Sequence, residues 1–301
     1  MLEPLVSVSM ATYNGERFVA EQLESIIHQT YKNIEIVIVD DHSTDSTISI
    51  IREFQKKYSF INVIPKEKNS GITKTFEEAI KNCRGEYIAF SDQDDIWEPG
   101  KIEILLNELK DEDAIYSNSL LVDKNGNSLN KEFKSLMHLQ SYYSGAPFLM
   151  GNCVPGHSIL MKASFSGKLL PFPAELMYDR WISFCSAANN GIRYMDQVLV
   201  KYRQHDKNLI GVGKSKRKVR RTKSEKFQIK LNELKAFEKA PIKSEETKKL
   251  LKTMLQYFKR KFSVKRSLFF FSNIDTILVI KNKPRVRKIL YCLKMFFKPN
   301  F

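Results

Sequence analysis

The chain has 301 residues, of which 43% are hydrophobic and 28% are charged. These values are typical of a globular protein with one large or two small domains, and they exclude a wholly disordered chain. The four cysteines lie far apart and form no C-x-x-C pair, so neither a zinc site nor a disulfide framework is expected. Reduced, mostly buried thiols in a cytosolic protein are predicted instead.

The net charge of +15 is concentrated in the last third of the chain. Residues 214–301 hold 27 Lys and Arg against 6 Asp and Glu, which leaves 22 basic and 28 acidic side chains in residues 1–213. We therefore predict a mildly acidic domain at 1–213 and a basic, amphipathic helical extension at 214–301. The first residues do not resemble a signal peptide, and no apolar run reaches the length of a membrane-spanning helix.

Residues 5–122 alternate short β-branched runs with apolar residues at helical spacing. Strands are predicted at 5–10, 34–39, 62–65, 86–90 and 114–122. Helical patterns separate them, so the sequence predicts an α/β fold with a mostly parallel sheet and helices on both faces. Residues 130–170 are less regular, and 178–189 is predicted to form a helix that buries Trp181, Ile182 and Phe184.

Polar side chains follow three of these strands. They are Thr12 and Tyr13, then Asp40 and Asp41, and then Asp92, Gln93, Asp94 and Asp95. Ligands of open α/β sheets bind outside the carboxyl ends of the strands. Clustered carboxylates repel one another unless a cation compensates, and Mg²⁺ and Mn²⁺ join carboxylates to substrate phosphates. A D-x-D pair alone is more typical of a solvated turn, but the glycine-rich loops of dinucleotide and P-loop enzymes are missing, which favours phosphate binding through a metal.

Several segments together resemble the opening of family 2 glycosyltransferases. They are V-S-M-A-T-Y-N-G at 8–15, S-I-I-H-Q-T-Y at 25–31, I-V-D-D-H-S-T-D at 38–45, N-S-G at 69–71, C-R-G-E-Y-I at 83–88 and S-D-Q-D-D-I-W at 91–97. Ala11 stands where the family usually has Pro. The D-Q-D-D-x-W motif resembles that of rhamnosyltransferase-like and galactosyltransferase-like members. The resemblance is dense over 5–105 and extends in part to about 211.

The resemblance implies a GT-A fold and inverting transfer from a nucleotide-diphospho-sugar. Thr12 and Tyr13 would line the base pocket, and Asp41 would accept a hydrogen bond from a pyrimidine base, which favours dTDP-rhamnose or a UDP-hexose. Asp40 would contact the nucleotide or set its loop. Asp92 would face the ribose of the donor or the metal, Gln93 would also bind the donor, and Asp94 would bind Mg²⁺ or Mn²⁺.

Two later segments also resemble the family. Residues 177–182 resemble its acidic-then-Trp segment, although Tyr178 and Arg180 depart from the frequent H-D-W-W. Asp179 would be the general base for the acceptor hydroxyl, with Glu175 as the fallback. Residues 202–211 resemble Y-R-Q-H-x-x-N-x-x-G, so Arg203 would neutralise phosphate charge and His205 would complete the metal shell or contact the diphosphate. His157 is a weaker candidate, since a loop histidine without a role is at least as common.

The basic extension admits three interpretations. Docking on an anionic membrane is favoured over a helix pair with a solvated basic face, and nucleic-acid binding is least favoured because no nucleic-acid module accompanies the charge. The predicted function is therefore an enzyme, a glycosyltransferase that extends a lipid-linked polysaccharide precursor, peripheral on the inner face of the cytoplasmic membrane. A nucleotidyltransferase acting on sugar phosphates and a non-catalytic membrane- or nucleic-acid-binding module are the alternatives.

Overall fold

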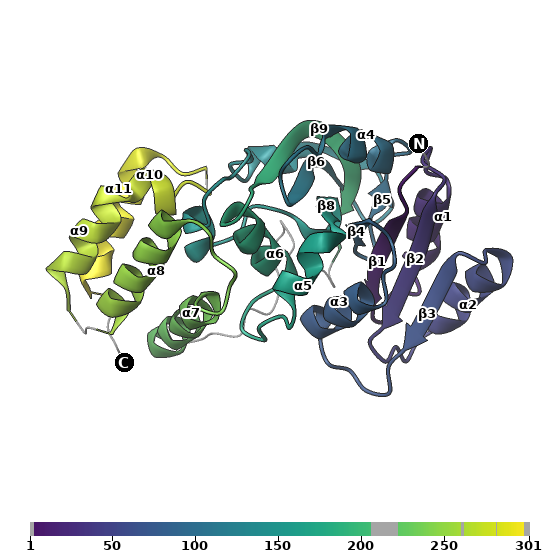
Figure 1. Ribbon diagram of the computed structural model, residues 1–301, viewed down its shortest axis with the longest axis horizontal. Coiled ribbons are helices and arrows are strands. Elements are labelled where there is room, and N and C mark those ends of the chain that lie inside the picture. Colours follow the sequence, from purple (N-terminus) through teal and green to yellow (C-terminus); the bar gives the residue numbers. More distant parts are fainter. Residues whose placement is uncertain (1–2, 206–221, 260–261, 281, 298–301) are drawn as a thin grey trace.

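The computed structural model describes residues 3–205, 222–259, 262–280 and 282–297 (Figure 1). The end of the predicted phosphate-binding segment, 206–211, and most of the basic cluster at 214–226 lie outside these residues. The sheet occupies one end of the long axis, and the C-terminal helices occupy the other (Figure 1).

One mixed sheet organises the described N-terminal part of the chain. Its order is β3-β2-β1-β4-β8-β6-β9-β5, and β7 pairs with β6. The strands are β1 (Val6–Thr12), β2 (Ile34–Asp40), β3 (Ile61–Pro65), β4 (Tyr87–Ser91), β5 (Ile96–Trp97), β6 (Ala114–Val122), β7 (Ser128–Glu132), β8 (Ile159–Lys162) and β9 (Ile192–Arg203).

The predicted strands and the α/β class are confirmed, and the second half of the sheet departs from parallel order. Strands β1 to β4 pair in parallel, which brings their carboxyl ends to one edge. Strand β8 then runs antiparallel between β4 and β6, and β9 pairs parallel to β6 but antiparallel to β5. Strand β8 has four residues within the irregular 130–170 region, too few to give a readable alternation.

Helices cover both faces of the sheet, as predicted. They are α1 (Val19–Ile27), α2 (Thr47–Lys57), α3 (Ile72–Lys81), α4 (Lys101–Glu108), α5 (Ser166–Leu169) and α6 (Tyr178–Ala187). Because side chains alternate along a strand, Ala89 of β4 packs in the cluster that includes α1 and α4, whereas Ile88 and Phe90 pack in the cluster that includes α3 and α6. Short 3₁₀ turns connect the later elements: η1 (Phe133–Ser135), η2 (Ala146–Leu149), η3 (Gly156–Ser158) and η4 (Ala163–Phe165).

The C-terminal region is helical, as expected, and it packs on the sheet domain through α6. Its elements are α7 (Lys223–Phe237), α8 (Glu245–Phe258), α9 (Val264–Ser272), α10 (Ile274–Ile277), α11 (Arg285–Lys294) and η5 (Met295–Phe297). Trp181, Ile182 and Phe184 are buried in α6, as predicted. The Phe237 ring of α7 lies 6.3 Å from Trp181 and 4.1 Å from Phe184, so α7 belongs to the same hydrophobic core as α6.

Two further expectations concern the cysteines and the membrane. All four cysteines are free, and three of them (Cys153, Cys185 and Cys292) are buried. Within the described ranges, no helix combines the length and the apolar character needed to cross a bilayer.

Candidate functional site

Asp40 ties together the ends of β1 and β2. Its carboxylate accepts hydrogen bonds from the Thr12 hydroxyl (2.7 Å), the Ser43 backbone N–H (2.7 Å) and the Ser43 hydroxyl (2.6 Å). The side chains of Thr12 and Asp40 are both buried. These bonds fix the loop after β2, and therefore the position of Asp41.

Asp41 follows β2 in the chain and contacts the residues that directly precede α3. Its carboxylate accepts the backbone N–H groups of Ser70 and Gly71, both at 2.8 Å, and Lys66 Nζ lies 3.2 Å away. Burial alone would raise the pKa of Asp41, but these three donors hold it below its ordinary value. Gly71 has φ of +85°, a conformation that favours glycine. Asp41 is thus an ionised, fixed acceptor, and its bond to a pyrimidine base stays a prediction.

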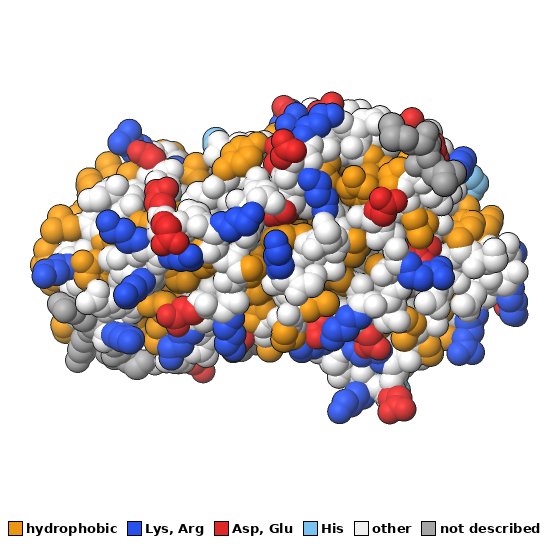
Figure 2. Space-filling model, in the orientation of Figure 1, with side chains coloured by type: hydrophobic (Ala, Val, Ile, Leu, Met, Phe, Trp, Pro, Cys, Tyr) orange, Lys and Arg blue, Asp and Glu red, His pale blue; other side chains and the backbone are white. Residues whose placement is uncertain are grey.

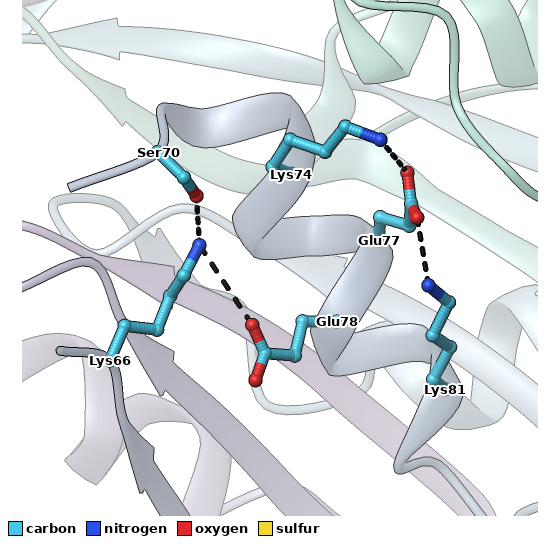
Figure 3. A pocket seen from close by; sticks show the side chains of 6 residues that line it. All are labelled: Lys66, Ser70, Lys74, Glu77, Glu78 and Lys81. Carbon is cyan, nitrogen blue, oxygen red and sulfur yellow. Dashed lines mark hydrogen bonds and ion pairs between the residues drawn. The ribbon is translucent and has the colours of Figure 1, made fainter. Parts of the chain in front are cut away.

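A surface hollow of about 450 Å³ adjoins Asp41 (Figure 3). Figure 3 shows Lys66 directed toward Ser70 and Glu78, and Glu77 between Lys74 and Lys81. The lining of the hollow therefore holds three ammonium groups and two carboxylates. Because these described charges pair with one another, the hollow is a poorer place for a diphosphate than the carboxyl edge of the sheet.

Gln93 fastens the D-Q-D-D loop to the end of β1. Its side-chain amide accepts the Tyr13 N–H at 2.8 Å and donates to the Tyr13 carbonyl at 3.0 Å. A Cβ atom on Gly15 would lie 2.3 Å from Gln93 Oε1, so a larger residue at position 15 would displace the Gln93 amide. The Tyr13 side chain remains 47% exposed at the same edge. The structure thus brings the predicted donor residues of the first and fourth strands together.

Tyr178 links Asp179, its neighbour in the chain, to Asp92. Tyr178 begins α6, stacks on Phe76 with ring centroids 3.9 Å apart, and donates its hydroxyl to Asp92 at 3.2 Å. Asp179 follows in the first turn of α6 and accepts the Arg180 N–H at 2.6 Å. Burial raises the pKa of Asp179 to about 6. Burial and the charges of Asp94 and Asp179 raise the pKa of Asp92 to about 7. The two carboxyl groups therefore share one electrostatic environment.

Asp94 pairs with His205 across the loop. His205 Nε2 lies 2.7 Å from Asp94 Oδ2, and both side chains keep some exposure, 10% and 16% respectively. This is the pair that the resemblance assigns to the metal. Carboxylate oxygen and imidazole nitrogen can both bind Mn²⁺, and a cation held by the two side chains would replace the hydrogen bond between His205 Nε2 and Asp94 Oδ2. The donor set therefore fits a divalent cation.

Arg203 supports the loop from inside the protein. It is buried, donates its backbone N–H to Asp95 at 3.0 Å and its Nε–H to the Asp94 carbonyl at 2.9 Å, and pairs with Glu21 at 2.5 Å. Its guanidinium also donates to the Lys124 carbonyl. Arg203 thus holds Asp94 and Asp95 in place, while its predicted contact with phosphate stays a prediction.

A buried ionisable cluster lies beneath the loop, and the sequence indicated its histidine only weakly. His157 Nδ1 lies 3.1 Å from Asp95 and 3.8 Å from Asp92, and its Nε2 lies 2.9 Å from the Ser119 hydroxyl. Lys101 donates to the His157 carbonyl at 2.6 Å and lies 3.2 Å over the Trp97 ring. Burial, followed by Lys101, lowers the pKa of His157 to about 3, so its imidazole is neutral.

Asp92, Asp95 and His157 form a second possible metal-ligand set among the described residues, with ligand atoms within 4.8 Å of one another. Both pairs are in contact, but Asp95 and His157 are almost fully buried, whereas Asp94 and His205 keep some exposure at the edge. Asp95 had a sequence signal, since it lies in the D-Q-D-D loop. Lys101 and Ser119 had none, because lysine and serine are usually exposed.

Glu175, the fallback base, is exposed in the loop before α6, whereas Asp179 is half-buried. Gly156 is packed against Tyr178, where an added Cβ would lie 2.0 Å from the Tyr178 hydroxyl.

The predicted site residues come from β1, β2, the loop after β4, α6 and the end of β9, all at or beneath one edge of the sheet.

This chain is similar to known glycosyltransferases. The family model described as "Glycosyl transferase family 2" matches residues 7–167. An uncharacterized glycosyltransferase of Rickettsia typhi is 31% identical over 212 residues, which are 67% of this chain and 65% of that protein. Two other Rickettsia glycosyltransferases are longer still, and this chain spans 34% of each.

Two solved structures have a similar fold. The S. aureus protein TarS (residues 1–349) in complex with UDP-GlcNAc superposes with a TM-score of 0.60 at 20% identity, over 97% of this chain and 80% of that one. A mannosyltransferase from Pyrobaculum calidifontis, in complex with GDP-Man and Mn²⁺, gives 0.57 at 15% identity over 98% and 81%. The predicted GT-A fold is thereby confirmed, and the rhamnosyltransferase-like or galactosyltransferase-like subgroup stays a prediction. On the family model and the relatives together, this chain belongs to glycosyl transferase family 2.

Proposed function

We propose that this chain is a metal-assisted, inverting glycosyltransferase that uses a pyrimidine-nucleotide sugar, dTDP-rhamnose or a UDP-hexose. One observation carries the proposal: Asp179 is the chain neighbour of Tyr178, whose hydroxyl donates to Asp92 of the D-Q-D-D loop at 3.2 Å, and burial raises the pKa of Asp179 to about 6. A carboxylate with this pKa is ionised at neutral pH and is still basic enough to accept a proton.

In the proposed reaction, Asp179 accepts the proton of the acceptor hydroxyl as the hydroxyl oxygen forms a bond to the anomeric carbon. The bond from that carbon to the diphosphate oxygen breaks on the opposite face, so the configuration is inverted and the nucleoside diphosphate leaves. Thr12, Tyr13, Asp40 and Asp41 would hold the nucleotide, and Asp92 and Gln93 would position the sugar-diphosphate. Arg203 would act here by keeping Asp94 in position.

Asp94 and His205 are the proposed ligands of Mg²⁺ or Mn²⁺. When bound, the cation supplies neutralisation of the negative charge that develops on the departing diphosphate. The proposal is supported by the contact between these two side chains, which keep some exposure at the edge of the sheet, and by the Mn²⁺ in the Pyrobaculum calidifontis structure.

The proposed acceptor is a lipid-linked precursor of a surface polysaccharide, used by an enzyme that is peripheral on the inner face of the cytoplasmic membrane. The net charge of +21 in residues 214–301 supports this location, because each Lys or Arg near an anionic leaflet contributes roughly 1 kcal/mol. The donor has to be measured directly, because the two similar structures hold different nucleotide sugars. TarS was solved with UDP-GlcNAc and the mannosyltransferase with GDP-Man.

Calorimetry with UDP, dTDP, GDP and CMP, each with and without Mg²⁺ or Mn²⁺, tests the proposal. We expect metal-dependent binding of UDP or dTDP alone, and its loss in Asp94→Ala. Asp111→Ala is the matched control, since Asp111 is exposed in the segment between α4 and β6. Preference for GDP would contradict the pyrimidine donor, and metal-independent binding that Asp94→Ala leaves unchanged would contradict the metal assignment.

A further inference from the structure

Two C-terminal helices present apolar stripes to solvent. On α9, Val264, Leu268 and Phe271 are 59%, 60% and 43% exposed. On α11, Val286, Leu290 and Leu293 are 66%, 49% and 53% exposed. Both sets have the spacing i, i+4, i+7, which places each set on one face of its helix. Single exposed hydrophobic residues are ordinary, but two such stripes on helices in contact are not.

The stripes do not result from poor packing of the two helices. Arg266 of α9 is buried and donates to the Met295 carbonyl at 2.7 Å and to the Tyr257 carbonyl at 2.9 Å. The Ser267 hydroxyl donates to the Cys292 carbonyl of α11 at 2.7 Å. Hydrogen bonds therefore hold the inner faces of α9 and α11 in place, and the apolar stripes lie on the outer faces of the two helices.

Basic residues flank these stripes almost without acidic counterparts. Residues 259–301 contain twelve Lys and Arg and a single acidic residue, Asp275. Lys265, Arg285, Arg287 and Lys294 are exposed on the same two helices. Figure 2 shows hydrophobic and basic side chains side by side over the end of the molecule that carries α9. A second copy of this chain would bring the same positive charge against itself, whereas an anionic surface complements it.

We propose that the outer faces of α9 and α11 are a docking surface for an anionic lipid bilayer. The two helices have nine and ten residues, too short to span a bilayer but suited to lie in its interface with their apolar stripes in the acyl region. Helices α7 and α8 take no part, because their apolar residues are already in the core with α6. The inference narrows the membrane location of the proposed function to one surface, and its test does not depend on sugar transfer.

Co-sedimentation with vesicles tests this surface in the full chain. We expect binding to phosphatidylcholine vesicles that contain phosphatidylglycerol, little binding to phosphatidylcholine alone, and weakening as salt increases. The double variant Leu268→Glu/Leu290→Glu should lower the partition coefficient at least about tenfold, because two leucines can no longer enter the interface. Leu129→Glu is the matched control, since Leu129 is 48% exposed on β7, and it should bind as the unchanged chain does.

Charge-reversal variants give a second test of the same surface. Arg287→Glu/Lys294→Glu should weaken binding to anionic vesicles, whereas Lys57→Glu on α2 should not. Equal binding to neutral vesicles, or vesicle binding that both double variants leave intact, would overturn the proposal. So would concentration-dependent dimerisation that only Leu268→Glu/Leu290→Glu abolishes, or binding to duplex DNA in place of vesicles. Metal-dependent nucleotide binding is measured in the same samples, so failure of the enzyme proposal is seen separately.

Discussion

At the residue scale, the proposed chemistry depends on Asp179. Replacing it with Asn keeps the shape of the side chain and removes the basic oxygen. We expect Asp179→Asn to lower kcat by about 100- to 10,000-fold and to leave nucleotide binding unchanged, since in the proposed reaction Asp179 would act on the acceptor hydroxyl. Initial-rate kinetics with calorimetry in parallel measures both quantities. Glu175→Gln is the control, and a comparable loss in that variant would move the base to Glu175.

The same residue predicts a pH dependence. Because burial raises the pKa of Asp179 to about 6, its carboxylate takes up a proton as the pH falls through that value. A general base must be ionised, so kcat/KM should fall by about tenfold for each pH unit below 6. The pH profile of kcat/KM measures this, because kcat/KM reports the pKa values of the free enzyme. A profile that stays level to pH 5 would exclude Asp179 as the base.

Gly156 allows a prediction about Tyr178. A Cβ at position 156 would lie 2.0 Å from the Tyr178 hydroxyl, which must then move away from Asp92. We expect Gly156→Ala to destabilise the fold by about 1–3 kcal/mol and to lower kcat. Gly151→Ala is the control, because a Cβ added at position 151 would have no neighbouring atom within 4 Å. Denaturant unfolding of both variants makes the comparison, and equal stabilities would contradict the packing argument.

At the element scale, α6 is held between the sheet and α7. Arg180, beside the proposed base, donates to the carbonyls of Phe148 and Leu149 and pairs with Glu233 of α7 at 2.7 Å. The Phe237 ring packs on Trp181 and Phe184 next to this ion pair. The first turn of α6, which carries Asp179, is thus fixed by a C-terminal helix as well as by the sheet.

This packing predicts the cost of removing Phe237. The ring is fully buried, so Phe237→Ala should lower the free energy of unfolding by about 3–5 kcal/mol. Lys235→Ala, at an exposed position of the same helix, should change it by less than about 0.5 kcal/mol. Urea unfolding of the two variants tests the prediction. A small loss for Phe237→Ala would mean that α7 does not share the core with α6 in solution.

At the scale of the whole molecule, the predicted domain at 1–213 and the extension at 214–301 differ in charge but share a core. Cutting the chain after residue 213 would expose Trp181 and Phe184 and leave Arg180 without Glu233. We expect the fragment 1–213 to lack a cooperative thermal transition, because it would have large apolar groups and a charge without their partners. Calorimetry of the fragment beside the full chain decides the matter, and a cooperative transition in the fragment would show an independent domain.

The sequence by itself determined much of the sheet and of its active edge. Buried parallel strands read as short β-branched runs, so β1, β2, β3, β4 and β6 could be predicted. Because the carboxyl ends of parallel strands meet at one edge, residues at or after those ends, such as Thr12, Asp41 and Asp94, could be placed at that edge, and their roles stay predictions. The family resemblance of these segments predicted the GT-A fold. These signals are local, so they can be read from a single sequence.

Only the tertiary structure decided which groups lie beneath that edge. His157 reaches Asp95 over 62 positions of sequence, and Arg180 reaches Glu233 over 53. The burial of Lys101, the antiparallel entry of β8 and the shared core of α6 and α7 likewise depend on contacts between distant segments. A local sequence pattern does not reveal such pairings. The free energy of each contact arises only when the chain has folded and both partners have left water.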